Sequence, residues 1–306
     1  KKSLELLQQR IIKKLPISFI INMKLNIDEN KMNKTIFKIR DQMIKGIVIT
    51  PLNLNKLVAI SSNSIFSVDL ESSFVSPEKN LIKNNNNDDP LQIIIHSHLN
   101  LILVISPYHA SLYDFNSEYG NQVSITFNQH QGSKFTCAQF SPNGEKVAIC
   151  SSFVEIYFFD FTTECQMPFM TINIYGQVNS ILWLNQDTFL IVAYISNKDK
   201  LQKLALINLL SSCIMPLPID PNLNGKINVM EIERRNGFII LGTKNGMAAI
   251  IELITSNDFK LKWLYDFKKT EVSAAAALNN LFAFGTLDGD VLLVDLENEN
   301  MANNFN

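Results

Sequence analysis

Short apolar runs, separated by polar or glycine-containing turns, follow one another along most of this chain. After Lys45 the spacing of apolar residues is rarely helical, and many runs alternate apolar and polar positions as half-buried strands do. No run approaches the roughly 18 apolar residues of a membrane-spanning helix. We therefore expect a predominantly β structure without a transmembrane segment.

Six of the runs end in the same pattern: an apolar residue, then Asp, Glu or Asn, then another apolar residue. The spacings between the central residues are 45, 46, 48, 44 and 43. Six such triplets in phase indicate an internal repeat, and as repeat elements we expect their central residues to be structural and not paired catalytic carboxylates. These repeat-defining residues are Asp69, Asp114, Asp160, Asn208, Glu252 and Asp295.

One unit shows the order of elements within a repeat most clearly. Strand-like segments at Phe135–Phe140 and Lys146–Cys150 flank the turn Ser141–Gly144, and a third strand follows at Val154–Phe161. Asn-Gly between apolar runs is a strong hairpin signal, since glycine tolerates the positive φ of such turns. Short strands grouped in fours with a regular period predict an all-β propeller. A β-sandwich is the main competitor, but it requires no regular period.

The order and spacing of these strands resemble those of WD40-repeat propellers, in which the third strand commonly ends in Trp-Asp. The resemblance covers roughly Lys45 to Glu299. No triplet here has Trp before the acidic residue, and the Gly-His pair of many family members is absent. The resemblance implies a divergent WD40-like β-propeller, whose subfamily stays open.

The repeat count predicts six blades and a specific mode of closure. The sequence ends ten residues after Leu296, so the last unit has no evident fourth strand, and the resemblance implies that an N-terminal strand at Thr35–Arg40 completes it. An alternative uses the run Ile17–Leu25 to begin a seventh, incomplete blade. The expected domains are a helix at residues 1–16, the propeller at 17–299 and a tail at 300–306.

Charge divides the chain unevenly. Residues 1–45 hold eleven basic and four acidic residues, a net +7, whereas the whole chain carries −2, so the remainder carries −9. The first fifteen residues place apolar side chains at helical spacing with basic residues off that stripe, which predicts an amphipathic helix. The candidate partner-binding residues are Leu4, Leu7, Ile11 and Leu15 on the stripe, with Arg10, Lys13 and Lys14 beside it. Packing against the propeller itself is the alternative.

The sequence gives little support for an enzyme. The closest pair among the four cysteines is 13 residues apart, so no Cys-x-x-Cys site exists, and their apolar neighbours indicate reduced, buried thiols. His96 and His98 share one face of a first strand, with His109 in the next turn, but structural histidines are the simpler interpretation than a metal site. Arg234 and Arg235 resemble the paired arginines of phosphoinositide-binding propellers, yet they occupy a hairpin turn and lack the flanking Phe and Gly.

These patterns predict a non-catalytic scaffold or adaptor subunit without a cofactor, which binds protein partners within a multi-subunit intracellular complex in the cytoplasm or nucleus. The resemblance supplies part of that interpretation. One alternative is an RNA- or ribosome-associated propeller that uses the basic N-terminal segment. A less favoured alternative is a propeller enzyme with a metal in its central channel.

Overall fold

A computed structural model describes residues 44–49, 56–61, 64–69, 79–80, 90–96, 101–114, 122–125, 133–153, 155–160, 167–185, 187–223, 225–255, 258–268, 270–278, 280–296 and 302–305. All regular elements in these ranges are β-strands, which form six four-stranded antiparallel sheets. None of these residues belongs to a helix of the length and apolar character that a membrane crossing requires.

The first three sheets take up the N-terminal half of the described chain. Sheet A contains β1 (Ile44–Ile49), β2 (Lys56–Ser61), β3 (Ser64–Asp69) and β4 (Lys79–Asn80). Sheet B contains β5 (Gln92–Ile95), β6 (Leu101–Ile105), β7 (Ala110–Asp114) and β8 (Gln122–Ile125). Sheet C contains β9 (Phe135–Phe140), β10 (Lys146–Ser151), β11 (Glu155–Asp160) and β12 (Met170–Asn173).

The other three sheets repeat the same order. Sheet D contains β13 (Gly176–Trp183), β14 (Phe189–Ser196), β15 (Gln202–Asn208) and β16 (Cys213–Leu217). Sheet E contains β17 (Ile227–Glu233), β18 (Phe238–Thr243), β19 (Met247–Thr255) and β20 (Asp258–Asp266). Sheet F contains β21 (Val272–Leu278), β22 (Leu281–Thr286), β23 (Val291–Asp295) and β24 (Ala302–Phe305).

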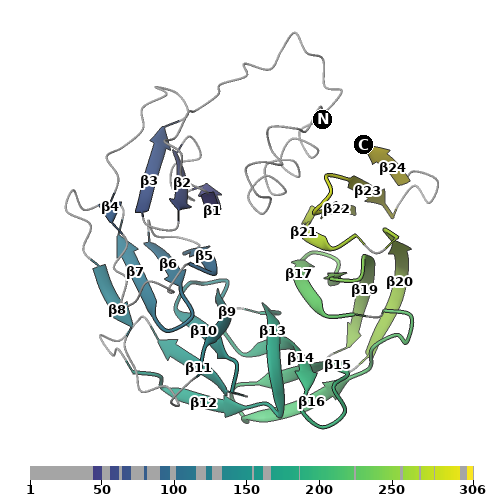
Figure 1. Cartoon of the computed structure of the whole chain (residues 1–306). Coiled ribbons are helices and arrows are strands. Elements are labelled where there is room, and N and C mark those ends of the chain that lie inside the picture. The colour runs from purple at the N-terminus through teal and green to yellow at the C-terminus, as the bar shows by residue number, and fades with distance from the viewer. Residues whose placement is uncertain are drawn as a thin grey trace.

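The sheets are arranged radially, like the blades of a propeller (Figure 1). The first strand of each sheet lies on the inside and the fourth on the outside. Neighbouring sheets contact each other mainly through these inner strands, at five junctions that run in sequence order from A–B to E–F. No comparable junction between sheets F and A is formed by the strands that the structure describes. The prediction of an all-β propeller is confirmed.

A sheet that lies between two other sheets is buried on both faces, which explains why its strands are apolar at nearly every position. In sheet D, Leu182 and Ile191 belong to the cluster shared with sheet E, whereas Trp183 and Val192 belong to the cluster shared with sheet C. Successive residues of a strand point to opposite faces, so a strand packed on both sides needs apolar residues at every position. This accounts for the run Phe189–Tyr194.

The closure predicted from the sequence is wrong. The fourth strand of sheet F is β24, near the C-terminus, which pairs antiparallel with β23 and places Val291 opposite Phe305. That edge of β23 is therefore occupied by the segment expected to be a tail, and Thr35–Arg40 is not needed there. The helix predicted over residues 1–16, Thr35–Arg40 and Ile17–Leu25 all lie outside the described residues.

Candidate functional site

The turns between strands form the two ends of the propeller. We call the end formed by the turns between second and third strands, such as 106–109 and 197–201, the upper face. We call the end formed by the turns between first and second strands, such as 141–145 and 234–237, the lower face.

The repeat-defining residues all occupy one register position next to the lower face. Each stands opposite the first residue of its second strand: for example, Asp160 opposite Lys146 and Asp295 opposite Leu281. The same holds for Asp69, Asp114, Asn208 and Glu252. Asn208 Oδ1 accepts a hydrogen bond from Leu210 N at 3.0 Å, and Glu252 Oε2 pairs with Lys262 Nζ at 2.8 Å. The six residues therefore share one register position, and their structural role remains a prediction.

A second repeated position, which the sequence interpretation missed, lies at the opposite end of the second strand. Every second strand ends in, or is followed directly by, a buried Ser or Thr. In sheet E, Thr243 Oγ1 accepts a hydrogen bond from Met247 N at 3.0 Å, and in sheet F, Thr286 Oγ1 accepts one from Asp290 N at 3.2 Å. The full set is Ser61, Ser106, Ser151, Ser196, Thr243 and Thr286. Its period was visible in the sequence, but isolated Ser and Thr residues draw no attention.

The His96 side chain packs between sheets B and C. It is buried, Nε2 lies 3.0 Å from the carbonyl oxygen of Gly144, and its ring meets that of Phe140 edge to face at 5.2 Å. A Cβ added to Gly144 would lie 2.2 Å from the His96 ring, so the glycine is required for this approach as well as for its φ of 79°. His96 therefore joins sheet B to the lower-face turn of sheet C.

The structure does not bring His96 and His109 together as a metal site. His109 lies in the upper-face turn before β7, at the opposite end of sheet B from His96, and His98 lies outside the described residues. Within the described ranges, no group of three or more His, Cys, Asp or Glu side chains is placed to hold a metal ion.

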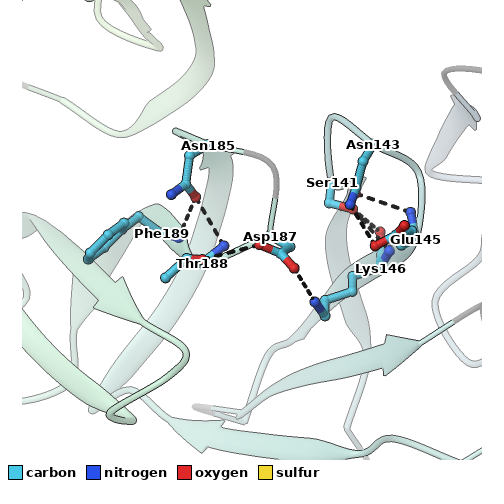
Figure 2. A network of polar contacts seen from close by, with 8 residues as sticks. All are labelled: Ser141, Asn143, Glu145, Lys146, Asn185, Asp187, Thr188 and Phe189. Carbon is cyan, nitrogen blue, oxygen red and sulfur yellow. Dashed lines mark hydrogen bonds and ion pairs between the residues drawn. The ribbon is translucent and has the colours of Figure 1, made fainter.

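Lower-face turns of neighbouring sheets are joined by polar contacts (Figure 2). Lys146 Nζ, on sheet C, donates to Asp187 Oδ2, on sheet D, at 2.6 Å. This hydrogen bond lowers the pKa of the Asp187 carboxyl group below its usual range. Within the sheet C turn, Ser141 Oγ donates to Asn143 Oδ1 at 2.6 Å and accepts from Lys146 N at 3.0 Å. The turns hold their own conformation and also connect the blades.

Arg234 extends this set of contacts to sheet E. Its guanidinium group donates to the carbonyl oxygens of Leu184 at 2.8 Å and Trp183 at 3.1 Å, both on sheet D. Burial lowers the pKa of this side chain. The neighbouring Arg235 is exposed, as Arg234 is over the rest of its surface. The two arginines therefore do not act as a pair, because one of them joins two sheets.

The thiols of Cys137 and Cys150 face each other across β9 and β10 and are both free and buried. Burial, followed by the contact with Cys137, raises the pKa of Cys150. A thiol with a raised pKa carries little reactive thiolate, so Cys150 is a packing group here. Cys213 is exposed, and Cys165 lies outside the described residues.

Large apolar side chains are exposed at both ends of the propeller. Those toward the lower face are Met167, Phe169, Leu210, Ile214 and Ile254, and Leu210 is 86% exposed. Six others lie on the upper face, on sheets B, C, D and F or on the segments that lead into those sheets, and Tyr175 is 86% exposed. These six residues are Leu91, Tyr108, Phe153, Tyr175, Leu201 and Leu287. Exposed apolar side chains that lie close together are typical of an interaction surface.

Comparison with known proteins supports the fold. No family model matches the sequence, and no curated protein matches it. Among solved structures, the β-propeller domain of Myceliophteria thermophila Cps50 (Swd1) is similar, with a TM-score of 0.65 and 12% sequence identity over 83% of this chain and 84% of that chain. The chain therefore has the fold of a WD40-like β-propeller.

Proposed function

We propose that this protein is a non-catalytic scaffold or adaptor subunit that binds other proteins within a multi-subunit intracellular complex, with its six sheets acting as the blades of one ring. The observation that supports this most directly is the set of exposed apolar side chains on the upper face. On the lower face, His96, Lys146 and Arg234 instead make contacts between neighbouring blades. WD40-like propellers commonly serve as interaction scaffolds, and this analogy adds to the argument.

The state of the cysteines supports an intracellular setting. Cys137 and Cys150 stand directly opposite each other on paired strands and yet remain free thiols. Unbridged thiols in such a position are typical of a reducing compartment.

Affinity purification of the tagged full-length chain, followed by quantitative mass spectrometry, tests this proposal. We expect a small set of proteins to co-purify in fixed stoichiometry with the chain and to remain bound through gel filtration. A chain that elutes at its own mass of 34.7 kDa, without stoichiometric partners, would contradict the scaffold function.

The N-terminal segment belongs to the same proposal as a docking element. Leu7→Asp combined with Ile11→Asp places charge on the predicted apolar stripe and should weaken complex formation while the propeller keeps its melting temperature. Glu5→Gln with Gln9→Glu, which leaves the stripe unchanged, serves as the control. Unchanged recovery of partners with the Asp variant would exclude the helix as a docking element, and a lowered melting temperature would indicate that it packs on the propeller.

A further inference from the structure

One part of the upper face combines exposed aromatic rings with lysines on adjoining turns. We call it the upper patch and define it as Tyr108 and Lys134 at the boundary of sheets B and C, Phe153 on sheet C, and Tyr175, Lys198, Lys200 and Leu201 on sheet D. All seven residues are exposed.

Backbone contacts join the first three of these residues. The carbonyl oxygen of Pro107 accepts a hydrogen bond from Phe135 N at 2.7 Å, so the turn of Tyr108 lies against the segment that contains Lys134. Lys134 Nζ lies 5.5 Å from the centre of the Tyr108 ring. Ser152 N donates to the carbonyl oxygen of Lys134 at 2.7 Å, which brings Phe153 next to that lysine.

The surface continues from Phe153 to sheet D. Glu155 pairs with Asn173 across β11 and β12, so the residues two positions beyond that pair, Phe153 and Tyr175, emerge at the same end of the sheet. Asn197 N donates to the carbonyl oxygen of Tyr175 at 3.0 Å. The turn that follows Asn197 carries the remaining residues of the patch, Lys198, Lys200 and Leu201.

The charge of this surface is unbalanced. No described residue forms an ion pair with any of its three lysines, Lys134, Lys198 and Lys200. The one acidic residue of the sheet D turn, Asp199, pairs with Lys203 at 2.6 Å, which lowers its pKa to about 2. Glu155, next to the sheet C turn, is buried and accepts a hydrogen bond from the Tyr157 hydroxyl. The patch therefore presents positive charge beside aromatic and aliphatic side chains.

We infer that the upper patch binds an acidic peptide segment of a partner protein, one that carries aromatic or aliphatic residues among its carboxylates. Such a segment would cover the apolar side chains and supply counter-charges to the lysines, a combination that favours both affinity and rate of association. This inference rests on the proposed function and specifies the chemistry of the partner.

A single-stranded nucleic acid would also find lysines and aromatic rings here, but the aliphatic component favours a peptide. Leu201 is 61% exposed, and Leu91, which precedes sheet B on the same face, is 53% exposed. An aliphatic side chain packs against an apolar peptide side chain, whereas bases are bound chiefly by stacking on aromatic rings.

Selection from a random 16-residue peptide phage library on the full-length protein tests the inference. We expect the selected peptides to be rich in Asp and Glu and to contain at least one Phe, Trp, Tyr, Leu or Ile. Their affinity, measured by fluorescence anisotropy with synthetic copies, should fall as ionic strength rises. Basic or neutral consensus peptides, or no enrichment above background, would overturn the inference.

Two variants locate the binding. Lys134→Glu with Lys198→Glu, and separately Phe153→Ser with Tyr175→Ser, should each weaken the selected acidic peptides at least tenfold without changing the melting temperature. The matched control, Leu210→Ser with Arg235→Glu, makes the same kinds of change at exposed lower-face residues and should leave affinity within twofold. Equal loss in the control, or tighter binding of a 20-nucleotide polyuridine RNA that the acidic peptide displaces, would overturn the inference.

The outcomes also separate this inference from the proposed function. If the upper-patch variants recover the same stoichiometric partners as the unmodified chain in affinity purification, the assignment of this surface is wrong while the scaffold function stands. If the unmodified chain has no stoichiometric partners, the scaffold function itself fails.

Discussion

Gly144 is a position where a single added methyl group should have a large effect. Its φ of 79° disfavours any other residue, and a Cβ would lie 2.2 Å from the His96 ring. We expect Gly144→Ala to reduce the free energy of unfolding by about 2–4 kcal/mol, as the sum of backbone strain and overpacking. Denaturation in guanidinium chloride measures this loss.

Gly237 provides the matched control. Its φ is 71°, but the nearest atom to an added Cβ is 3.4 Å away. Gly237→Ala should therefore cost only the backbone term, about 1 kcal/mol. Equal losses for the two variants would show that the contact between His96 and Gly144 contributes nothing.

Each buried Ser or Thr hydroxyl group at the end of a second strand should stabilise the upper-face turn that follows it. Thr243→Val keeps the shape of a fully buried side chain but leaves Met247 N without its 3.0 Å acceptor. We expect a loss of about 1–2 kcal/mol, together with faster amide hydrogen exchange at Met247. Thr171→Val, at an exposed position, should change stability by less than about 0.5 kcal/mol. Unchanged exchange at Met247 would contradict the capping role.

At the scale of whole elements, contacts between neighbouring sheets determine how well the blades hold together. Arg234→Ala removes two hydrogen bonds from sheet E to the Trp183 and Leu184 carbonyl groups of sheet D. We expect a loss of about 1–3 kcal/mol in the free energy of unfolding. Arg235→Ala removes neither of these contacts and should stay within about 0.5 kcal/mol. Similar losses for both variants would mean that Arg234 contributes through the conformation of its own turn and not through its hydrogen bonds to sheet D.

The ion pair between sheets C and D should make stability depend on pH in a defined direction. The pKa of Asp187 is lowered in the folded state, chiefly by its hydrogen bond to Lys146, so its contribution is present above the unfolded value of 3.8. That contribution is lost as the pH falls through the lower, folded pKa. We expect the stability difference between the unmodified chain and Asp187→Asn to be constant near neutral pH and to shrink below pH 3.8. A difference that grows on acidification would contradict the pairing.

The repeated elements could be predicted from the sequence because the same pattern of strands and turns occurs six times along the chain. Five of the six triplets marked the ends of third strands, and Asn143-Gly144 marked a hairpin turn that the structure contains. The sequence did not predict β24, because Ala302–Phe305 is largely polar and shows no apolar alternation. It also did not predict the contact between His96 and Gly144, since residues 48 positions apart are brought together only by packing of the blades.

The same limit applies to the candidate site. The residues of the upper patch come from three sheets. Taken one at a time, a Phe, Tyr or Lys in a turn is common in any chain and does not indicate a binding site. Their adjacency follows from blade packing and from pairs such as Glu155 with Asn173, which no local pattern encodes. The partner-binding residues predicted at Leu4, Leu7, Arg10, Ile11, Lys13, Lys14 and Leu15 lie outside the described residues and remain a prediction.

At the scale of the whole molecule, the propeller buries both faces of the sheets that lie between two others. Polar contacts on the lower face join neighbouring blades, and the upper face exposes apolar and basic side chains. The proposed scaffold function rests on this exposed upper surface.

The most direct test of the central claim is the native mass of the full-length chain, isolated under mild conditions and measured by light scattering after gel filtration. The account predicts a defined assembly well above 34.7 kDa that contains other proteins in whole-number ratios. The upper-patch variants should shift the chain toward its monomer mass. A monomer that is the same with or without these substitutions would contradict the account.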